Sequence, residues 1–146
     1  MNWQKIVATC FGFGRLPIAP GTWGSLFGLL IWIFIPLDYA TQFLFILITF
    51  ILGLYVSKIV AKQLNDHDPS EIVIDEVVGM MISLYMLPKT FGLYFTSFCL
   101  FRILDIFKPS LIYHSQKLSN GWGIMMDDIL AGIITLLIMQ GLQTIL

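Results

Sequence analysis

Charged residues are scarce in this chain of 146 residues, at 12% against 58% hydrophobic residues. Soluble globular domains carry about 25% charged residues, so the composition excludes that class and predicts a membrane protein. Eight Lys and Arg stand against nine Asp and Glu, which leaves no excess positive charge to neutralise nucleic-acid phosphates. We therefore expect no nucleic-acid binding, and the length predicts one domain over residues 1–146.

Several common site signatures are also missing. The two cysteines, Cys10 and Cys99, form no CxxC pair, which excludes a disulfide framework or a zinc site. Only four residues separate Cys10 from Arg15, whereas a cysteine phosphatase needs five. A Walker A loop, a DxDxT motif and the helix pattern of CDP-alcohol phosphotransferases are absent from the sequence.

The first fifteen residues lack the apolar core and cleavage site of a secretory signal. Their apolar residues instead recur at helical spacing, which predicts an amphipathic helix lying in the membrane interface. The residues on that face are Trp3, Ile6, Val7, Cys10 and Phe11.

Five long apolar segments fill most of the chain. They are Gly24 to Leu37, Gln42 to Val60, Ile72 to Leu87, Phe91 to Phe107 and Ile124 to Leu146. A full membrane span needs about 20 residues, so the first and third segments are short. We predict an all-α integral membrane helical bundle of about five apolar segments, plus the N-terminal interfacial helix.

The positive charges predict an orientation. On a path that crosses the membrane at each segment, seven of the eight Lys and Arg fall on one side, and Lys89 alone falls on the other. The positive-inside rule assigns the side with seven charges to the cytosol. The stretch 12–25 and the joints 65–76 and 102–128 are then expected at the cytosolic face.

Five of the nine acidic residues lie inside or at the mouth of apolar segments. A charged residue at the centre of a membrane helix costs about 2.5 to 3.5 kcal/mol, so these carboxylates are candidates for sharing a cation. They are Asp75, Glu76, Asp105, Asp127 and Asp128. Four bases are expected in the same layer, and acids beside bases suit a phosphorylated ligand bound through Mg²⁺. The bases are Arg15, Lys62, Arg102 and Lys108.

Two acidic pairs share one pattern. Asp75 is followed by Gly79 one helical turn later, and Asp128 is followed by Gly132 at the same spacing. A small residue lets another helix approach closely, so the two helices could pack against each other around a metal ion. Ser70 is placed to cap the first of these helices. The alternative for acids near a helix N-terminus is an interaction with the helix dipole alone.

Two further motifs supply candidate phosphate ligands. The stretch 12–25 holds two X-Pro turns and four glycines, with Thr22 or Ser25 placed to cap the next helix and expose N–H groups to a phosphate. Its alternative is a capped turn at the membrane surface. Arg102, Asp105 and Lys108 recur every three residues and share one helix face. Their alternative is an ion pair among side chains that reach toward the membrane boundary.

These four motifs, in this order from Gly12 to Gly132, resemble the phosphatidylglycerophosphatase A family of bacterial lipid phosphatases. The stretches that carry the resemblance are APGTWGS, IVIDEVVGM, FRILDIFKP and GWGIMMDDILAG. The resemblance implies Mg²⁺-dependent removal of the terminal phosphate from phosphatidylglycerol phosphate, with phosphatidylglycerol and inorganic phosphate as products. It also implies a multi-pass protein of the bacterial inner membrane, with membrane lipid as its surroundings.

The resemblance assigns roles residue by residue. The implied metal ligands are Asp75, Glu76, Asp127 and Asp128; the implied phosphate-binding residues are Arg102, Lys108, Thr22 and Ser25; the implied catalytic residues are Asp75, Asp105 and Asp128. Asp105 would orient Arg102 or donate a proton to the leaving glycerol oxygen. Attack by water and formation of an aspartyl-phosphate are both compatible with these residues, as are one or two Mg²⁺ ions.

Other functions are compatible with the same acids. Another Mg²⁺-dependent phospholipid head-group enzyme would use a similar carboxylate cluster. A small cation transporter also carries intramembrane carboxylates, but its acids would line the full depth of the bundle rather than one face. The sequence leaves the oligomeric state open.

Overall fold

The computed structural model describes residues 2–118 and 121–145, which form a helical protein without β-strands in those ranges. The all-α prediction is confirmed. Leu146, the predicted end of the last segment, lies outside the described residues. The elements are α1 (Trp3–Ala8), the 3₁₀ helix η1 (Phe13–Arg15), α2 (Pro20–Ile33), α3 (Tyr39–Leu64), α4 (Ile74–Leu84), α5 (Phe91–Phe107), α6 (Ser110–Ser115) and α7 (Trp122–Ile145).

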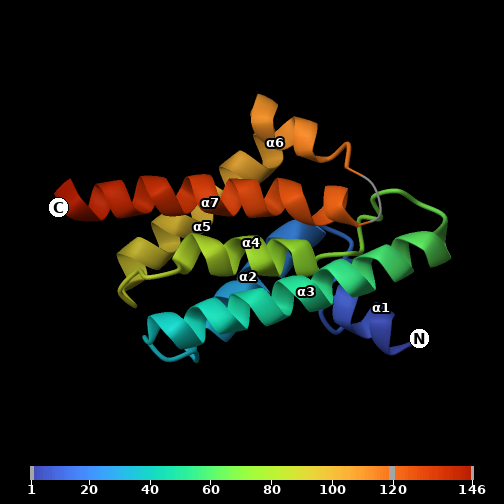
Figure 1. Cartoon of the computed structure of the whole chain (residues 1–146), viewed down its shortest axis with the longest axis horizontal. Helices are drawn as coiled ribbons and strands as arrows, with labels where there is room; N and C mark the ends of the chain where they lie inside the picture. Colours follow the sequence, from blue (N-terminus) through green and yellow to red (C-terminus); the bar gives the residue numbers. More distant parts are fainter. Residues whose placement is uncertain (1, 119–120, 146) are drawn as a thin grey trace.

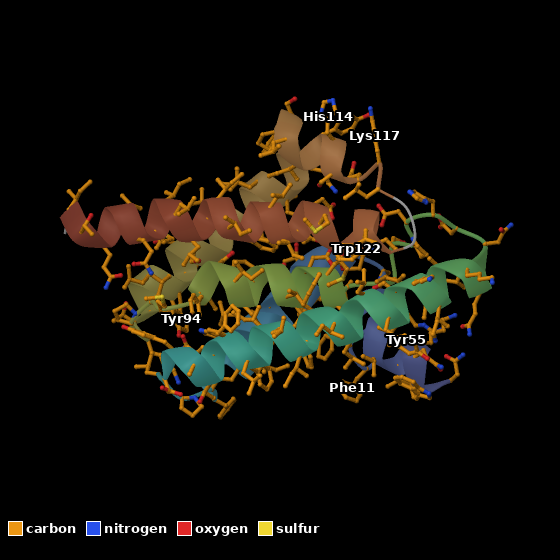
Figure 2. All side chains as sticks on the ribbon, in the orientation of Figure 1. Phe11, Tyr55, Tyr94, His114, Lys117 and Trp122 are labelled. Atoms are coloured by element: carbon orange, nitrogen blue, oxygen red, sulfur yellow. The ribbon has the colours of Figure 1, made fainter. Side chains whose placement is uncertain are left out.

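Two of these helices, α3 and α7, are long and apolar enough to cross a membrane, and α2 is a shorter apolar helix. This is fewer than the five membrane segments that the sequence predicts, although a helix overlaps each predicted range. The outer surface suits a lipid environment, since α3 exposes Phe43, Ile48 and Ile51, and large apolar side chains cover much of the outside in Figure 2.

Helix α1 covers part of the stretch predicted as an interfacial helix, but it ends at Ala8, and Cys10 and Phe11 lie beyond it with positive φ angles of 49° and 60°. Asn2 caps it, because the Asn2 side chain accepts a hydrogen bond from the Lys5 N–H. Trp3 stacks on Tyr55 of α3, with ring centroids 6.1 Å apart. The helix is therefore held against the bundle, and its position at a membrane surface stays a prediction.

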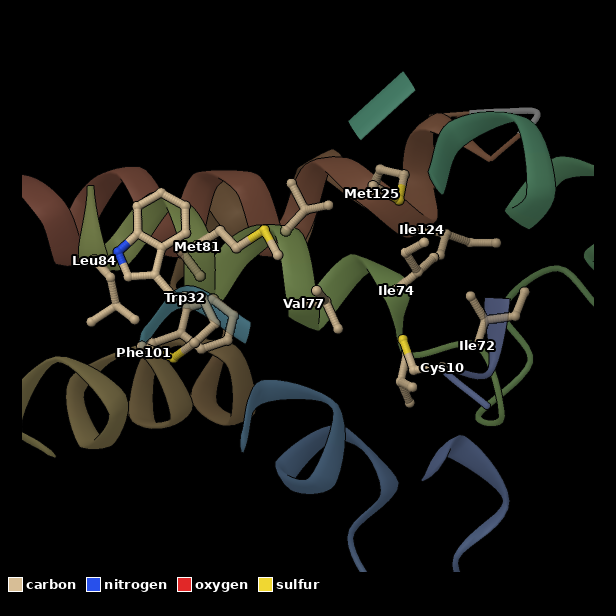
Figure 3. Packing of buried hydrophobic residues seen from close by; sticks show 14 of the residues in the cluster. Cys10, Trp32, Ile72, Ile74, Val77, Met81, Leu84, Phe101, Ile124 and Met125 are labelled. Atoms are coloured by element: carbon tan, nitrogen blue, oxygen red, sulfur yellow. The ribbon is translucent and has the colours of Figure 1, made fainter. Parts of the chain in front are cut away.

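Helix α4 is the centre of the bundle. It lies between α3 and α7 in Figure 1, with α2 and α5 behind it, and it packs most extensively against α7 and α2. Nine of its eleven residues are buried. Figure 3 shows Val77, Met81 and Leu84 of this helix beside Trp32 of α2 and Phe101 of α5. At about 1.5 Å per residue the helix is about 16 Å long, and protein rather than lipid covers it.

Glycines set the close crossing of α4 and α7. A Cβ added to Gly79 would lie 2.7 Å from the backbone oxygen of Asp128, and one added to Gly132 would lie 2.5 Å from the backbone oxygen of Gly79. Both distances are shorter than any real Cβ contact, so only glycine allows this approach. The predicted packing of the two acid-then-glycine helices is thus confirmed.

Two predicted helix starts are wrong. Helix α2 begins at Pro20 with Ala19 as its N-cap, so Thr22 and Ser25 lie inside the helix and do not cap it. Proline suits the first helical position, because its fixed φ and missing N–H cost nothing there. Val73 rather than Ser70 occupies the N-cap position of α4, and its side chain makes no capping hydrogen bond. Ser70 and Glu71 lie in a turn before the helix, and the Val73 N–H donates to the Ala8 carbonyl at 2.9 Å.

Candidate metal and phosphate site

All five predicted carboxylates meet on the wall of one cavity of about 340 Å³. The cavity lies where the ends of α2, α4, α5 and α7 come together, and Pro20 and Gly21 line it from the start of α2. Asp75 and Glu76 stand in the first turn of α4, and Asp105 stands in the last turn of α5. Asp127 and Asp128 stand in the second turn of α7. The close crossing of α4 and α7 therefore brings acids from distant parts of the sequence into one place.

The carboxylates form two overlapping groups. One oxygen each from Asp75, Asp127 and Asp128 lie within 4.8 Å of one another, and the same holds for Glu76, Asp105 and Asp128. Asp128 belongs to both groups and is 1% exposed. Asp105, which was not among the predicted metal ligands, is part of the second group.

Four buried carboxylate oxygens of this cluster have no hydrogen-bond partner among the described residues. They are Oδ1 of Asp75, Oε2 of Glu76, Oδ1 of Asp127 and Oδ1 of Asp128. A buried polar atom without a partner is costly, and carboxylate oxygens are the ligands that hard divalent cations prefer. The residues at this site therefore fit a metal ion.

Charge balance supports the same conclusion. Asp68 joins the five predicted acids on the cavity wall, whereas the bases there are Arg102 and Lys108. Carboxylates this close together destabilise one another in the ionised form unless a cation or proton intervenes. Two bases leave most of that repulsion unbalanced, so a bound cation would stabilise the arrangement.

Each of the two bases is held by an acid. Arg102 donates through Nη1 to Asp105, and the same nitrogen lies 3.5 Å from the Ser25 hydroxyl oxygen. Lys108 donates through Nζ to Oδ2 of Asp127 at 2.7 Å. Burial lowers the pKa of Lys108, but its hydrogen bond to Asp127 and the surrounding negative charges outweigh burial, so the net pKa is raised. Lys108 is therefore a cation at neutral pH.

Two residues of the site were missed by the sequence reasoning. A Cβ on Gly21 would lie 2.8 Å from Oε1 of Glu76 and 3.1 Å from Nη1 of Arg102, so this glycine leaves room for both groups. Asp68 stands exposed at the rim, and its N–H donates to Oδ1 of Asp66 at 3.1 Å. Partial burial of its carboxylate and the charge of Asp75 raise the pKa of Asp68. The DHDPS stretch before the first acidic pair was the available signal for Asp68.

Other predicted residues lie outside the cavity. Neither Thr22 nor Ser25 is among the described residues on its wall. Arg15 pairs instead with Glu71, with Nε and Oε2 3.0 Å apart. Lys62 lines a separate surface hollow together with Lys58. The structure therefore brings two of the four predicted bases to the acids.

A buried carboxylate cluster that fits a metal ion shares its cavity with two bases, in a helical protein with two helices long and apolar enough to cross a membrane. The model of one family matches the chain over residues 6–143, and its description is phosphatidylglycerophosphatase A. The chain belongs to this phosphatase family.

Curated relatives agree with this assignment. A phosphatidylglycerophosphatase A of Haemophilus influenzae is 37% identical over 98% of this chain and 90% of its own length. One of Escherichia coli is 37% identical over 92% of this chain and 80% of its own length. A Bacteroides thetaiotaomicron protein that bears the provisional name phosphatidylinositol-3-phosphatase is 38% identical over 88% and 86% of the two chains. No solved structure matches the chain.

Proposed function

We propose that this protein removes the terminal phosphate from phosphatidylglycerol phosphate and releases phosphatidylglycerol and inorganic phosphate, with Mg²⁺ as its cofactor. The observation that carries the proposal is a set of four buried carboxylate oxygens that have no hydrogen-bond partner in residues 2–118 and 121–145. They lie beside two bases, in a member of a phosphatase family. Two relatives that match nearly the whole chain are phosphatidylglycerophosphatases by name.

The two carboxylate groups suggest two ion positions that share Asp128. Asp75 and Asp127 would complete one position, and Glu76 and Asp105 the other. Bound Mg²⁺ supplies a Lewis acid for the phosphoryl oxygens and lowers the pKa of a water molecule. The protein's part is to hold the phosphate and the water in a fixed geometry among preorganised charges.

Arg102 and Lys108 are proposed to bind the phosphate. A guanidinium has five donors and an ammonium has three, and their pairing with Asp105 and Asp127 leaves further donors available on each. Asp105 holds the guanidinium of Arg102 at Nη1, which leaves the other nitrogens for contact with phosphate oxygens. Ser25 contacts Arg102, so we assign it a positioning role, while phosphate binding by Thr22 stays a prediction.

We further propose a single domain that crosses the bacterial inner membrane at about five apolar segments, with the site at the cytosolic face. Arg102 and Lys108 lie at the site, and Lys5 and Arg15 both contact Glu71 just before α4. Lys89 instead contacts the carbonyls of Ile33 and Ile35 at the other end of α2. This segregation of charge supports the orientation that the positive-inside rule predicts.

The test is phosphate release by the purified protein in detergent. Phosphatidylglycerol phosphate with Mg²⁺ should give free phosphate, and EDTA should abolish the release. One relative is named for a lipid with a different head group, so phosphatidylinositol 3-phosphate is assayed in parallel. A higher kcat/KM for this lipid would show that phosphatidylglycerol phosphate is not the preferred substrate.

Asp128→Asn should abolish turnover while the protein stays folded, because this residue contributes to both carboxylate groups. Asp38→Asn is the matched control. Asp38 is exposed and caps α3 by accepting from the Thr41 N–H, and asparagine caps helices equally well. Near-normal phosphate release by Asp128→Asn would rule out the assigned site. Cation flux in liposomes without any phosphate release would favour the transporter alternative.

A further inference from the structure

An apolar groove of about 470 Å³ lies between α2 and α5. Its walls include Leu26 and Leu29 of α2 and Tyr94, Phe95 and Phe98 of α5. We propose that this groove holds an acyl chain of the same phospholipid whose phosphate occupies the carboxylate cavity. The inference rests on the proposed function, since it takes the substrate to be a membrane phospholipid.

The groove begins next to the proposed phosphate-binding residues. Helices α2 and α5 touch where Nη1 of Arg102 lies 3.5 Å from the Ser25 hydroxyl oxygen. Leu26 follows Ser25 directly, and Phe98 precedes Arg102 by four residues, which is about one helical turn. The groove and the cavity are therefore neighbours along the same two helices, and a single lipid can reach both.

The length of the groove matches one leaflet of a bilayer. Phe91, at its far end, precedes Arg102 by eleven residues, or about 16 Å of helix. Half of a hydrocarbon core about 30 Å thick is about 15 Å. An acyl chain whose head group lies beside Arg102 is therefore long enough to extend along the whole groove.

The two ends of the groove are lined by different kinds of residue. At the far end Nζ of Lys89 donates to the carbonyl oxygens of Ile33 and Ile35, at 2.7 and 2.5 Å, so the end of α2 and the residues after it occupy two of its three donors. In Figure 2, Tyr94 lies to the left along the long axis of the molecule, and Trp122, the first residue of α7, lies to the right. The polar residues Lys89 and Thr90 thus line the far end of the groove, and its end next to the site is lined by Leu26 and Phe98.

A second apolar hollow provides the internal comparison. It holds about 290 Å³ and is lined by residues of α3, α4 and α7, among them Phe43, Leu47 and Ile129. Helices α2 and α5, which carry Gly21 and Arg102, contribute nothing to its described walls. A hollow of this kind is expected to take bulk lipid without regard to the head group.

The kinetic test compares substrates that differ only in acyl length. Leu29→Trp fills the groove and should lower kcat/KM at least about tenfold for phosphatidylglycerol phosphate with sixteen-carbon chains. Turnover of the six-carbon analogue should stay near wild type, because its short chains do not need the groove. Leu47→Trp in the second hollow should change neither. An equal loss on both substrates, or unchanged activity on the long one, overturns the proposal.

Photo-crosslinking tests occupancy without turnover. A phosphatidylglycerol phosphate that carries a diazirine near the acyl terminus is irradiated with the protein, and labelled peptides are mapped by mass spectrometry. Labels should concentrate on residues 26–33 and 91–98 and decrease when unlabelled phosphatidylglycerol phosphate, but not phosphatidylcholine, is added. Equal labelling of the second hollow overturns the groove. Competed labelling without phosphate release would keep the groove and reject the proposed reaction.

Discussion

At the residue scale, Gly21 shows how one small residue makes room for the charged groups of the site. Its missing side chain leaves space for Glu76 and Arg102, which come from different helices. The atoms that a Cβ would meet are ends of flexible side chains, so they can move without disturbing the backbone. A substitution at Gly21 should therefore affect activity much more than folding.

Gly21→Ala is expected to lower kcat/KM about tenfold to a hundredfold, since small displacements of charged groups cost that much in preorganised sites. The thermal midpoint in detergent should stay within a few degrees of wild type. Gly92→Ala is the control, because a Cβ there meets nothing within 4 Å. Wild-type kinetics for Gly21→Ala would contradict the placement of Glu76 and Arg102 at the site.

Arg102 offers a second prediction at the residue scale. Arg102→Lys keeps the positive charge but removes the planar fork that matches a phosphate. We expect kcat/KM for phosphatidylglycerol phosphate to fall at least about tenfold. Arg15→Lys makes the same change at an arginine paired with Glu71, and it should leave kinetics unchanged. Similar losses in both variants would show that the effect is not specific to the cavity.

At the scale of elements, the crossing of α4 and α7 decides where the carboxylates lie. Gly79 and Gly132 face the backbone of the opposite helix, and backbone atoms cannot turn aside as side chains can. The same crossing brings Asp75 near Asp128. Packing and site geometry therefore depend on the same pair of glycines.

Gly79→Ala should destabilise the protein by about 1 to 3 kcal/mol, the usual cost of overpacking a core. Thermal unfolding in detergent is the measurement, and Mg²⁺-dependent phosphate release should fall because the two helices are forced apart. Gly141→Ala in α7 is the matched control, since a Cβ there has open space and alanine favours helix. Full stability of Gly79→Ala would show that the crossing is looser than described.

At the scale of the whole molecule, the orientation in the membrane can be tested by cysteine labelling. Lys62→Cys and Lys117→Cys should react with an impermeant maleimide from the cytosolic side, and Leu37→Cys and Thr90→Cys from the opposite side. The charge distribution gives this expectation. Native Cys10 is buried in the protein. Labelling of Thr90→Cys from the cytosol would reduce the number of crossings and contradict the five-segment path.

Parts of this fold and site were predictable from local sequence. Each apolar segment overlaps a helix, because periodicity and breaker residues act over a few neighbours. The acids stood out because their neighbours are apolar. Local reasoning failed where distant contacts occur. The N-cap of α4 is Val73, whose N–H bonds to Ala8, and Arg15 pairs with Glu71 rather than with the acids of the cavity.

From the sequence alone, apolar surroundings and an acidic site are predicted for this protein. An apolar, charge-poor chain surrounds its helices with lipid or with protein, and carboxylates within it are candidates for sharing a cation. Tertiary structure alone decided which oxygens meet, that Asp105 joins Glu76 and Asp128, and that a groove between α2 and α5 adjoins the site. Those features depend on how closely helices approach, and steric contacts between residues far apart in the sequence set that distance.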